Sequence, residues 1–473
     1  MIVVFTGIFS CTDDITGLNQ NTKDATVVPA AYLFTNAQKN IVDQMVSTNV
    51  NFNVFRLFTQ QWTETTYTDE SNYDVATRTI PDNHWAVLYR DVLMDLKESK
   101  KYLLLYQPAT PAEEAENANR IAIIDILSAY SYSVLVDTFG DVPYTEALDV
   151  EAHPLPKYDD AETIYRDLIS KLTVASNTLD SGYGSFDGAD LIYSGDASKW
   201  KLFANSLRLK LAINMDDVDH AYASTQALAA VSAGVINNNS DNSALKYLSA
   251  QPNANPVFVD VVASGRDDFV PTSTIIDQMN GLNDPRRSQY FTQIGGIYEG
   301  GTPGASSNFA NFSHIGDTLL DPTFEGLIMD ASEVEFLLAE AVGRGIAVGG
   351  TAESHYNAAI TASMNYWAVS ASDIATYLLQ PSVAYTTATG TWKQKIGEQA
   401  YLALYNRGFE CWTSFRRLDF PALIAPATAD ESVVPTRLTY PSKEETLNAT
   451  NNAAASAAIG GNTLINKLFW DVN

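Results

Sequence analysis

Apolar residues recur along much of the chain at the spacing of an amphipathic α-helix, in which every third or fourth residue returns to the same face. Ile164, Leu168 and Leu172 follow this spacing, and Trp200 and Phe203 open a later stretch of the same kind. The pattern predicts a mainly α-helical protein. The predicted helices span residues 30–48, 84–105, 115–139, 158–180, 197–214, 332–345, 352–367 and 393–418.

Several predicted helices follow one another closely along the chain. One such pair is 158–180 with 197–214, and another is 332–345 with 352–367. Helix pairs of this size indicate packing similar to that of tetratricopeptide repeats, although the strict repeat consensus is absent.

Two helix ends carry start or stop signals. Ser332, followed by Glu335 three residues later, predicts a capping box at the start of a helix. The apolar stretch before Gly140 predicts a buried helix that ends there, because a Gly just past a helix and a Pro soon after it, here Pro143, are typical of helix ends. We interpret the acidic residues around this end, Asp141 among them, as structural rather than catalytic.

Two long regions, 49–83 and 234–330, lack helical periodicity. The first is polar and aromatic, and the second is rich in Asn, Gly, Pro and Ser. Loops of this length are too long to be mere connections and often carry function. No change of composition marks a linker, so we predict a single domain over residues 11–473. Its helical scaffold is predicted mainly at 30–48, 84–230 and 331–420.

The charge of the chain narrows the range of partners. Its 56 acidic residues outnumber its 29 basic residues, which gives a net charge of -27. A surface of this kind repels nucleic acid and anionic membrane faces, so no nucleic acid is expected as a partner. The charge fits a soluble surface protein or a protein that binds neutral ligands.

The first eleven residues, MIVVFTGIFSC, form a short apolar run that ends at a cysteine. Ile8 and Ser10 precede Cys11 at the positions of a bacterial lipobox, so residues 1–10 are predicted to be a signal peptide and Cys11 the site of lipidation. No Lys or Arg precedes the run, which leaves the start of the signal peptide open. The alternative is a buried N-terminal strand. A lipidated Cys11 leaves no disulfide partner for Cys411, which we expect in the core.

Six motifs are spread along the chain. They are SYSVLVDTFGDVPYTEAL, WKLFANSLRLKLAIN, NDPRRSQYF, EVEFLLAEA, GFECWTSFRRLDFP and RLTYPSKEETLNATNN. In this order they resemble the signatures of the SusD-like (SusD/RagB) nutrient-binding lipoproteins of the Bacteroidetes outer membrane. Each motif alone is modest, but the series is specific and covers nearly the whole chain.

The resemblance implies a single helical domain with tetratricopeptide-like helix pairs and a loop-rich ligand-binding face. It also implies a surface-exposed lipoprotein that is anchored in the outer membrane through Cys11 and acts as the lid of a SusC-like TonB-dependent transporter in nutrient uptake. Ligands of this family are usually oligosaccharides, so a non-catalytic glycan-binding protein is expected. The alternatives are a lid that captures oligopeptides and a surface glycoside hydrolase.

No cofactor and no metal site is predicted. The five histidines are scattered and lack the spacing of zinc ligands. The stretch TDESNYD, residues 68–74, offers oxygen atoms without the spacing of an EF-hand, and we interpret it as a solvated turn. Arg416 and Arg417 are interpreted as part of a helix-packing motif.

Sugar binding requires aromatic rings that stack on the apolar faces of pyranoses, with amide, acid or guanidinium groups beside them for the hydroxyls. Both loop-rich regions have this composition, and the resemblance places the ligand contacts of the family broadly in these regions. The alternative for each aromatic residue is a place in the core, and for Tyr290 the two are evenly balanced. The candidate ligand-binding residues are Trp62, Tyr67, Tyr73, Arg266, Asp267, Tyr290, Tyr298, Asn308 and Phe309.

Overall fold

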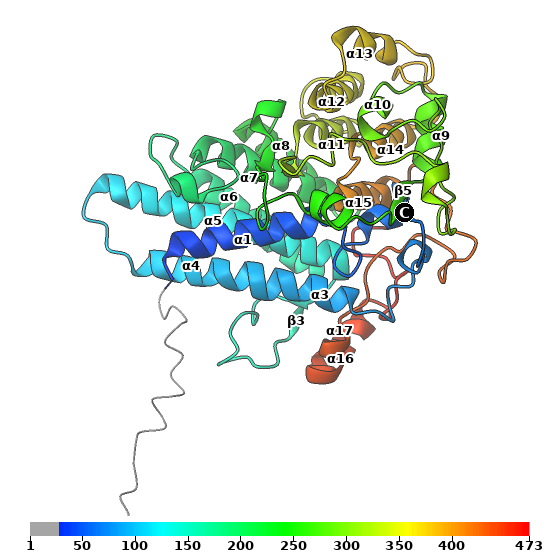
Figure 1. Cartoon of the computed structure of the whole chain (residues 1–473). Coiled ribbons are helices and arrows are strands. Elements are labelled where there is room, and N and C mark those ends of the chain that lie inside the picture. The colour runs from blue at the N-terminus through cyan, green and yellow to red at the C-terminus, as the bar shows by residue number, and fades with distance from the viewer. Residues whose placement is uncertain (1–27, 473) are drawn as a thin grey trace, which may run out of the picture.

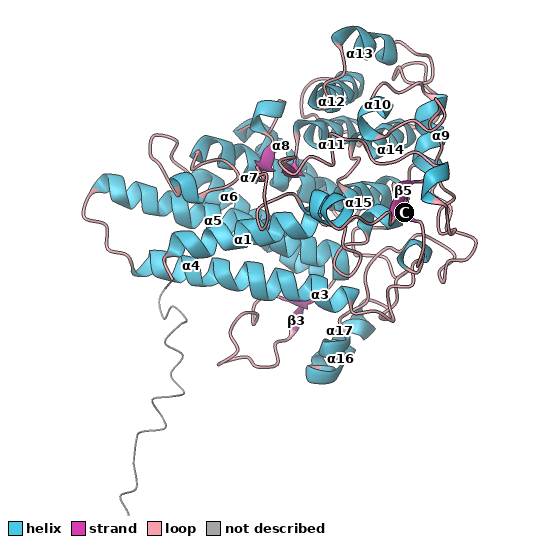
Figure 2. Ribbon diagram, in the orientation of Figure 1, coloured by secondary structure: helices cyan, strands magenta, loops and turns pink. Residues whose placement is uncertain are grey.

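Helices dominate the structure, a computed structural model that describes residues 28–472 (Figures 1 and 2). The α-helices are α1 (Ala30–Val46), α2 (Phe55–Phe58), α3 (Ile80–Ala86), α4 (Met94–Leu105), α5 (Pro111–Phe139), α6 (Ala161–Thr178), α7 (Ala197–Asn214), α8 (His220–Ala233), α9 (Ser273–Gly281), α10 (Arg287–Tyr290), α11 (Ala331–Gly343), α12 (Ala352–Tyr366), α13 (Ala371–Leu378), α14 (Trp392–Ala403), α15 (Gly408–Leu418), α16 (Ser442–Leu447) and α17 (Ala449–Ala458). The predicted signal peptide and Cys11 lie outside the described residues.

Consecutive helices pack against one another as the sequence predicts. Helices α4 to α8 are neighbours in series, and α7 joins this group to α11, which packs on α12 and α14. Both predicted pairs, α6 with α7 and α11 with α12, are therefore present. Figure 1 shows the first group around the dark blue helix α1 and the second group at the upper right.

The few strands form three small antiparallel pairs. The pair β1–β5 joins Trp62 to Pro271 and Glu64 to Phe269 at its two ends, and so connects the two regions predicted to be rich in loops. The strands are β1 (Trp62–Glu64), β2 (Val142–Pro143), β3 (Tyr158–Asp159), β4 (Ser243–Leu245), β5 (Phe269–Pro271) and β6 (Gly326–Met329), with β2 paired to β3 and β4 to β6.

Two predicted helix boundaries are wrong. The stretch 393–418 forms two helices, α14 and α15, with a break at residues 404–407. The capping box at Ser332 does not form, because Asp330 is the N-cap of α11 and its side chain accepts a hydrogen bond from the Glu333 amide at 2.8 Å. Ser332 lies inside the helix and donates its hydroxyl to the carbonyl of Ala359.

The buried helix α5 ends as predicted. Gly140 has a φ of +86°, a left-handed conformation that glycine adopts without steric cost. Beyond it, the Asp141 carboxylate accepts a hydrogen bond from the Ala161 amide at the start of α6, at 2.9 Å. Asp137 is buried and accepts hydrogen bonds from Tyr165 and Trp470. Helix α5 is long and apolar enough to cross a membrane, but most of it is buried, as in a core helix.

Charged side chains cross-link the helices inside the core. Glu333 of α11 accepts hydrogen bonds from Lys210 of α7 and from Arg407 at the start of α15, at 2.9 and 2.6 Å. Burial alone raises the pKa of Glu333, but the two cations outweigh burial and lower it to about 2. Arg417 pairs in the same way with the buried Glu340. The predicted packing role of Arg417 is confirmed.

Removing one member of this network should be costly. Glu333→Gln leaves Lys210 and Arg407 buried without their shared anion, so we expect the free energy of unfolding to fall by about 3–5 kcal/mol. The matched control, Glu98→Gln, breaks an exposed pair with Lys101 (2.8 Å) and should cost less than about 1 kcal/mol. Urea denaturation of both variants measures the difference. Equal effects would show that the buried network does not stabilise the fold.

Candidate functional site

The two loop-rich regions meet beside the β1–β5 pair. The Thr65 amide donates to the carbonyl of Asp268 at 2.8 Å, which extends the pairing by one residue. The Ser307 amide donates to the Thr65 carbonyl at 2.8 Å and brings a third segment, around residues 305–309, to the same place. Segments about 200 residues apart in sequence therefore form one surface.

An open cleft of about 390 Å³ lies next to this sheet, and we call it the loop cleft. It is lined by residues from the loop after α1 (48–51), from 64–70 and from 260–269, and by Arg78. Its volume is in the range of pockets that hold small molecules. The cleft thus combines parts of both regions in which the sequence predicted ligand contacts.

Tyr67 is the prominent aromatic residue of the loop cleft. Its side chain is 82% exposed, although large aromatic residues are normally buried. Its backbone adopts a φ of +53°, a left-handed conformation that costs about 1 kcal/mol or more in a residue of this bulk. Strain of this kind is concentrated at functional sites, and an exposed ring beside polar groups suits the face of a sugar.

The loop cleft is rich in carboxylates. Both of its arginines are already engaged: Arg78 pairs with Glu70 at 2.9 Å and with Asp69 at 3.7 Å, and Arg266 pairs with Asp268 at 2.8 Å. The lining therefore carries more carboxyl groups than guanidinium groups.

Glu64 lies at the inner end of the cleft and is 5% exposed. Burial raises the pKa of its carboxyl to about 8, and the negative charge of Glu70 adds to this effect. The Ser71 amide and hydroxyl both donate to Glu64 at 3.0 Å. At neutral pH the Glu64 carboxyl therefore retains its proton for most of the time.

Some predicted ligand-binding residues do lie at the cleft. Tyr67 and Arg266 line it, and Asp267 is exposed next to Arg266, with its carbonyl accepting the Thr65 hydroxyl at 2.7 Å.

The prediction is wrong for three of the aromatic residues, which are buried and cannot stack on a sugar. Trp62 is 1% exposed and donates its indole N–H to the Tyr405 hydroxyl at 3.0 Å. Tyr290 is fully buried and stacks on Tyr405, with ring centroids 4.2 Å apart. Tyr73 is also fully buried, with its hydroxyl bonded to Gln60. Local composition does not reveal this burial, because distant core residues enclose all three rings.

The remaining candidates lie outside the lining of the cleft. Tyr298 is half-buried, with the Arg287 guanidinium over its ring at 5.5 Å. Phe309 is also half-buried and stacks on His314, with ring centroids 3.8 Å apart. Asn308 is exposed and caps the short helical turn that follows it. Because the Ser307 amide donates to the Thr65 carbonyl, the neighbouring residues Asn308 and Phe309 lie near the rim of the cleft.

Sequence reasoning missed the acidic side of the cleft. The stretch 68–74 is not a solvated turn, since Glu70 is 2% exposed and packs inward from a short 3₁₀ helix. Asp260 was also missed, and it receives a hydrogen bond from the Thr48 hydroxyl at 3.0 Å. In a chain with 56 acidic residues, no local signal separates these carboxylates from the others.

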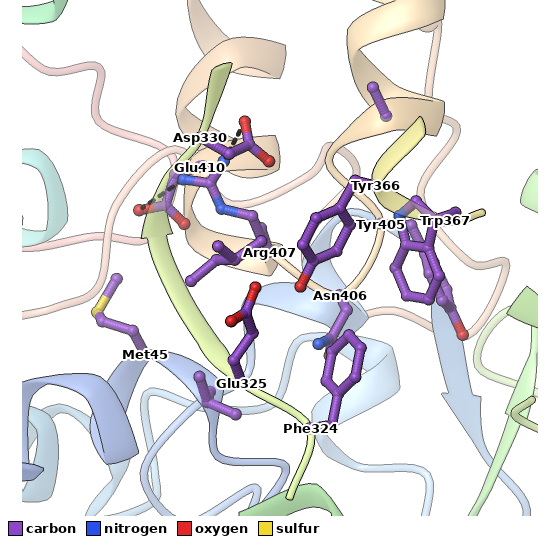
Figure 3. A pocket seen from close by; sticks show the side chains of 13 residues that line it. Met45, Phe324, Glu325, Asp330, Tyr366, Trp367, Tyr405, Asn406, Arg407 and Glu410 are labelled. Atoms are coloured by element: carbon purple, nitrogen blue, oxygen red, sulfur yellow. Dashed lines mark ion pairs between the residues drawn. The ribbon is translucent and has the colours of Figure 1, made fainter. Parts of the chain in front are cut away.

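The interior holds a second pocket, shown in Figure 3, between Tyr366, Glu325 and Arg407. Figure 3 marks the ion pairs of Arg407 with Asp330 and Glu410, at 3.1 and 4.0 Å. Its volume of about 20 Å³ admits one water molecule and no sugar ring. We therefore assign it to the buried charge network.

Two further grooves lie on the helical scaffold. One, of about 420 Å³, opens beside Tyr32 on α1, and the other, of about 560 Å³, opens beside Tyr144. Neither is lined by both loop-rich regions. Among residues 28–472, no three His, Cys, Asp or Glu side chains are grouped so that they could hold a metal ion.

Comparisons with known proteins agree on one family and one fold. A family model described as SusD-like, "Starch-binding associating with outer membrane", matches residues 21–441. A chitin-binding protein of known structure is 27% identical, with a TM-score of 0.80 over 94% of this chain and 100% of its own. A SusD homolog from Bacteroides uniformis is 26% identical, with a TM-score of 0.78 over 93% of this chain and 100% of its own.

A chitin-binding SusD homolog from Flavobacterium johnsoniae shares the fold at 24% identity, with a TM-score of 0.77 over 94% of this chain and 98% of its own. A search of curated proteins found no match. The matches confirm the resemblance drawn from the six motifs and the mainly α-helical fold.

The pKa of Glu64 leads to a prediction about stability. The folded protein keeps this proton up to about pH 8, whereas the unfolded chain loses it near pH 4.5. The free energy of unfolding of the natural protein should therefore fall across that window, by at most about 1.4 kcal/mol per pH unit, and the loss is complete above pH 8.

Glu64→Gln mimics the protonated carboxyl and removes the contribution of Glu64 to the pH dependence of the free energy of unfolding. Its free energy of unfolding, measured by urea denaturation relative to the natural protein, should rise between pH 4.5 and 8 and then level off. A difference that stays constant across this range would contradict the assignment of a raised pKa to Glu64.

Proposed function

The chain belongs to the SusD-like family, and we propose that it is a non-catalytic glycan-binding protein of the cell surface, with the loop cleft as its ligand site. The observation that carries the proposal is the position of the exposed Tyr67 ring in a polar cleft formed by both loop-rich regions.

Binding in the loop cleft follows from the chemistry of a pyranose. One face of the Tyr67 ring is available to pack on the apolar C–H face of a sugar, and the hydroxyls of the sugar then meet polar groups around it. Asp69 and Asp268 offer carboxylate acceptors at the rim, where their side chains are 57% and 34% exposed. A few placed polar groups around an apolar contact are typical of small-molecule sites.

The acidic pair in the cleft favours binding over hydrolysis. A glycosidase holds two carboxyl groups about 5 to 9.5 Å apart, one on each side of the bond that it cleaves. Glu64 instead lies beside Glu70, whose negative charge adds to the rise in the pKa of Glu64, and Arg78 pairs with Glu70 at 2.9 Å. Both carboxyl groups are almost fully buried, so they are poorly placed to flank a sugar, which supports the proposal that the substrate is not cleaved.

The cellular setting is part of the same proposal. A lipid on Cys11 would anchor the protein to the outer membrane, and the protein would act as the lid of a SusC-like TonB-dependent transporter during nutrient uptake. The lipobox pattern around Cys11 and the outer-membrane association in the family description support this setting. The net charge of -27 fits a surface that faces solvent.

Calorimetric titration tests the function directly. We expect heat of binding with a neutral oligosaccharide, and chitohexaose is the first probe because one similar structure is that of a chitin-binding protein. A panel of other neutral glycans and mixed peptides completes the set. Tyr67→Ala should weaken binding about two- to tenfold, since an aromatic contact contributes about 0.5–1.5 kcal/mol.

Two variants serve as controls for Tyr67→Ala. Tyr67→Phe keeps the ring and should retain the affinity, whereas Tyr183→Ala removes an exposed tyrosine (41%) of the helical scaffold and should change nothing. If only peptides give heat of binding, the ligand is an oligopeptide and not a glycan. If Tyr67→Ala binds the glycan as tightly as the natural protein, the loop cleft is not the ligand site.

A further inference from the structure

We propose that the loop cleft takes amino sugars, either N-acetylated or with a free amine, and rejects sugars that carry acidic groups. This inference rests on the proposed glycan-binding function and adds the chemical class of the ligand.

The charges that line the cleft are strongly one-sided. Asp69, Glu70, Asp260 and Asp268 face two guanidinium groups, Glu64 keeps its proton, and no lysine or histidine contributes to the lining. Arg56, whose charge acts on Asp260, is buried and bonded to Asn406 and to the carbonyls of Val46 and Ser47. An acidic sugar would therefore enter a negative cleft on a protein whose net charge is already -27.

Both arginines of the cleft already pair with a carboxylate, so the charge of each is compensated within the protein. Arg266 holds the Asp268 carboxylate at 2.8 Å, and Arg78 holds the Glu70 carboxylate at 2.9 Å. A sulfate or carboxylate on the sugar would share a guanidinium group with one of these carboxylates and lie beside a like charge. Juxtaposed like charges are a common means by which binding sites reject the wrong partner.

The balance of donors and acceptors points to the same ligand class. A carboxylate accepts hydrogen bonds and cannot donate them, so the exposed Asp69 and Asp268 side chains at the rim favour a ligand that brings donors. An acetamido group brings an N–H donor, and a protonated amine brings three donors and a positive charge.

A matched set of ligands isolates the effect of charge. The probes are three hexamers on one β-1,4-linked glucosamine backbone, which differ only at nitrogen: N-acetyl (neutral), free amine (cationic at pH 6.5) and N-sulfo (anionic). We expect the amine and N-acetyl hexamers to bind, with the amine weakened by added salt, and the N-sulfo hexamer to bind at least tenfold more weakly than the N-acetyl hexamer in calorimetry at low salt.

A charge variant then tests which residues select the ligand. Asp268→Asn releases the exposed Arg266, so the N-sulfo hexamer should gain at least threefold in affinity and the amine hexamer should lose a similar factor. Asp69→Asn, at a side chain that is 57% exposed, should shift both affinities in the same direction. The control is Asp125→Asn, which removes a carboxylate that pairs with Lys100 on the helical scaffold and is exposed to about the same degree as Asp268. It should change the affinity for neither hexamer.

The outcomes separate this inference from the function on which it rests. Equal binding of the N-sulfo and N-acetyl hexamers would overturn the selection by charge and leave glycan binding intact. If none of the three hexamers binds, the assignment to amino sugars is wrong. The glycan-binding function is then tested separately with the wider glycan panel. If no glycan of that panel binds either, both the assignment to amino sugars and the glycan-binding function are wrong.

Discussion

The antiparallel pairing of β1 with β5 is the contact on which the proposed site depends. Three residue pairs and the adjoining hydrogen bond from Thr65 to Asp268 hold together chain segments about 200 residues apart. Together with the hydrogen bond from the Thr48 hydroxyl to Asp260, this contact fixes the loops after α1 and before α9 around the loop cleft. The indole of Trp62 anchors β1 from behind through its bond to Tyr405. A ring that the sequence suggested for ligand binding thus has a different role, since it fixes the strand that forms the site.

The helical scaffold supplies the rigidity behind this contact. Helix α1 runs through the first helix group and delivers residues 48–51 to the edge of the cleft. Arg56, just beyond it, donates to the carbonyls of Val46 and Ser47 at the end of α1 and to Asn406 before α15. The buried pairs around Glu333 fix α15 to α7 and α11. Removing charge from water is costly, so such pairs hold their geometry only while every partner remains in place.

The helices could be predicted from the sequence, because their periodicity is a local property that packing then uses. Ile164, Leu168 and Leu172 are buried as their spacing indicates. The site could be predicted only by region. Tyr67 and Trp62 look alike in sequence, five residues apart in a polar stretch, yet one is 82% exposed and the other 1%. The difference comes from Tyr405, more than 300 residues away, which no local pattern reveals. Nothing in the local pattern marks Glu64 and Glu70 as buried among the 56 acidic residues of the chain.

The central claim is that a glycan binds in the loop cleft, and hydrogen exchange read by mass spectrometry tests it most directly. The account predicts that saturating oligosaccharide slows amide exchange in segments 64–78 and 260–269, and leaves helices α16 and α17 unchanged. Protection at the groove beside Tyr32 or Tyr144, with no change in these two segments, would contradict it.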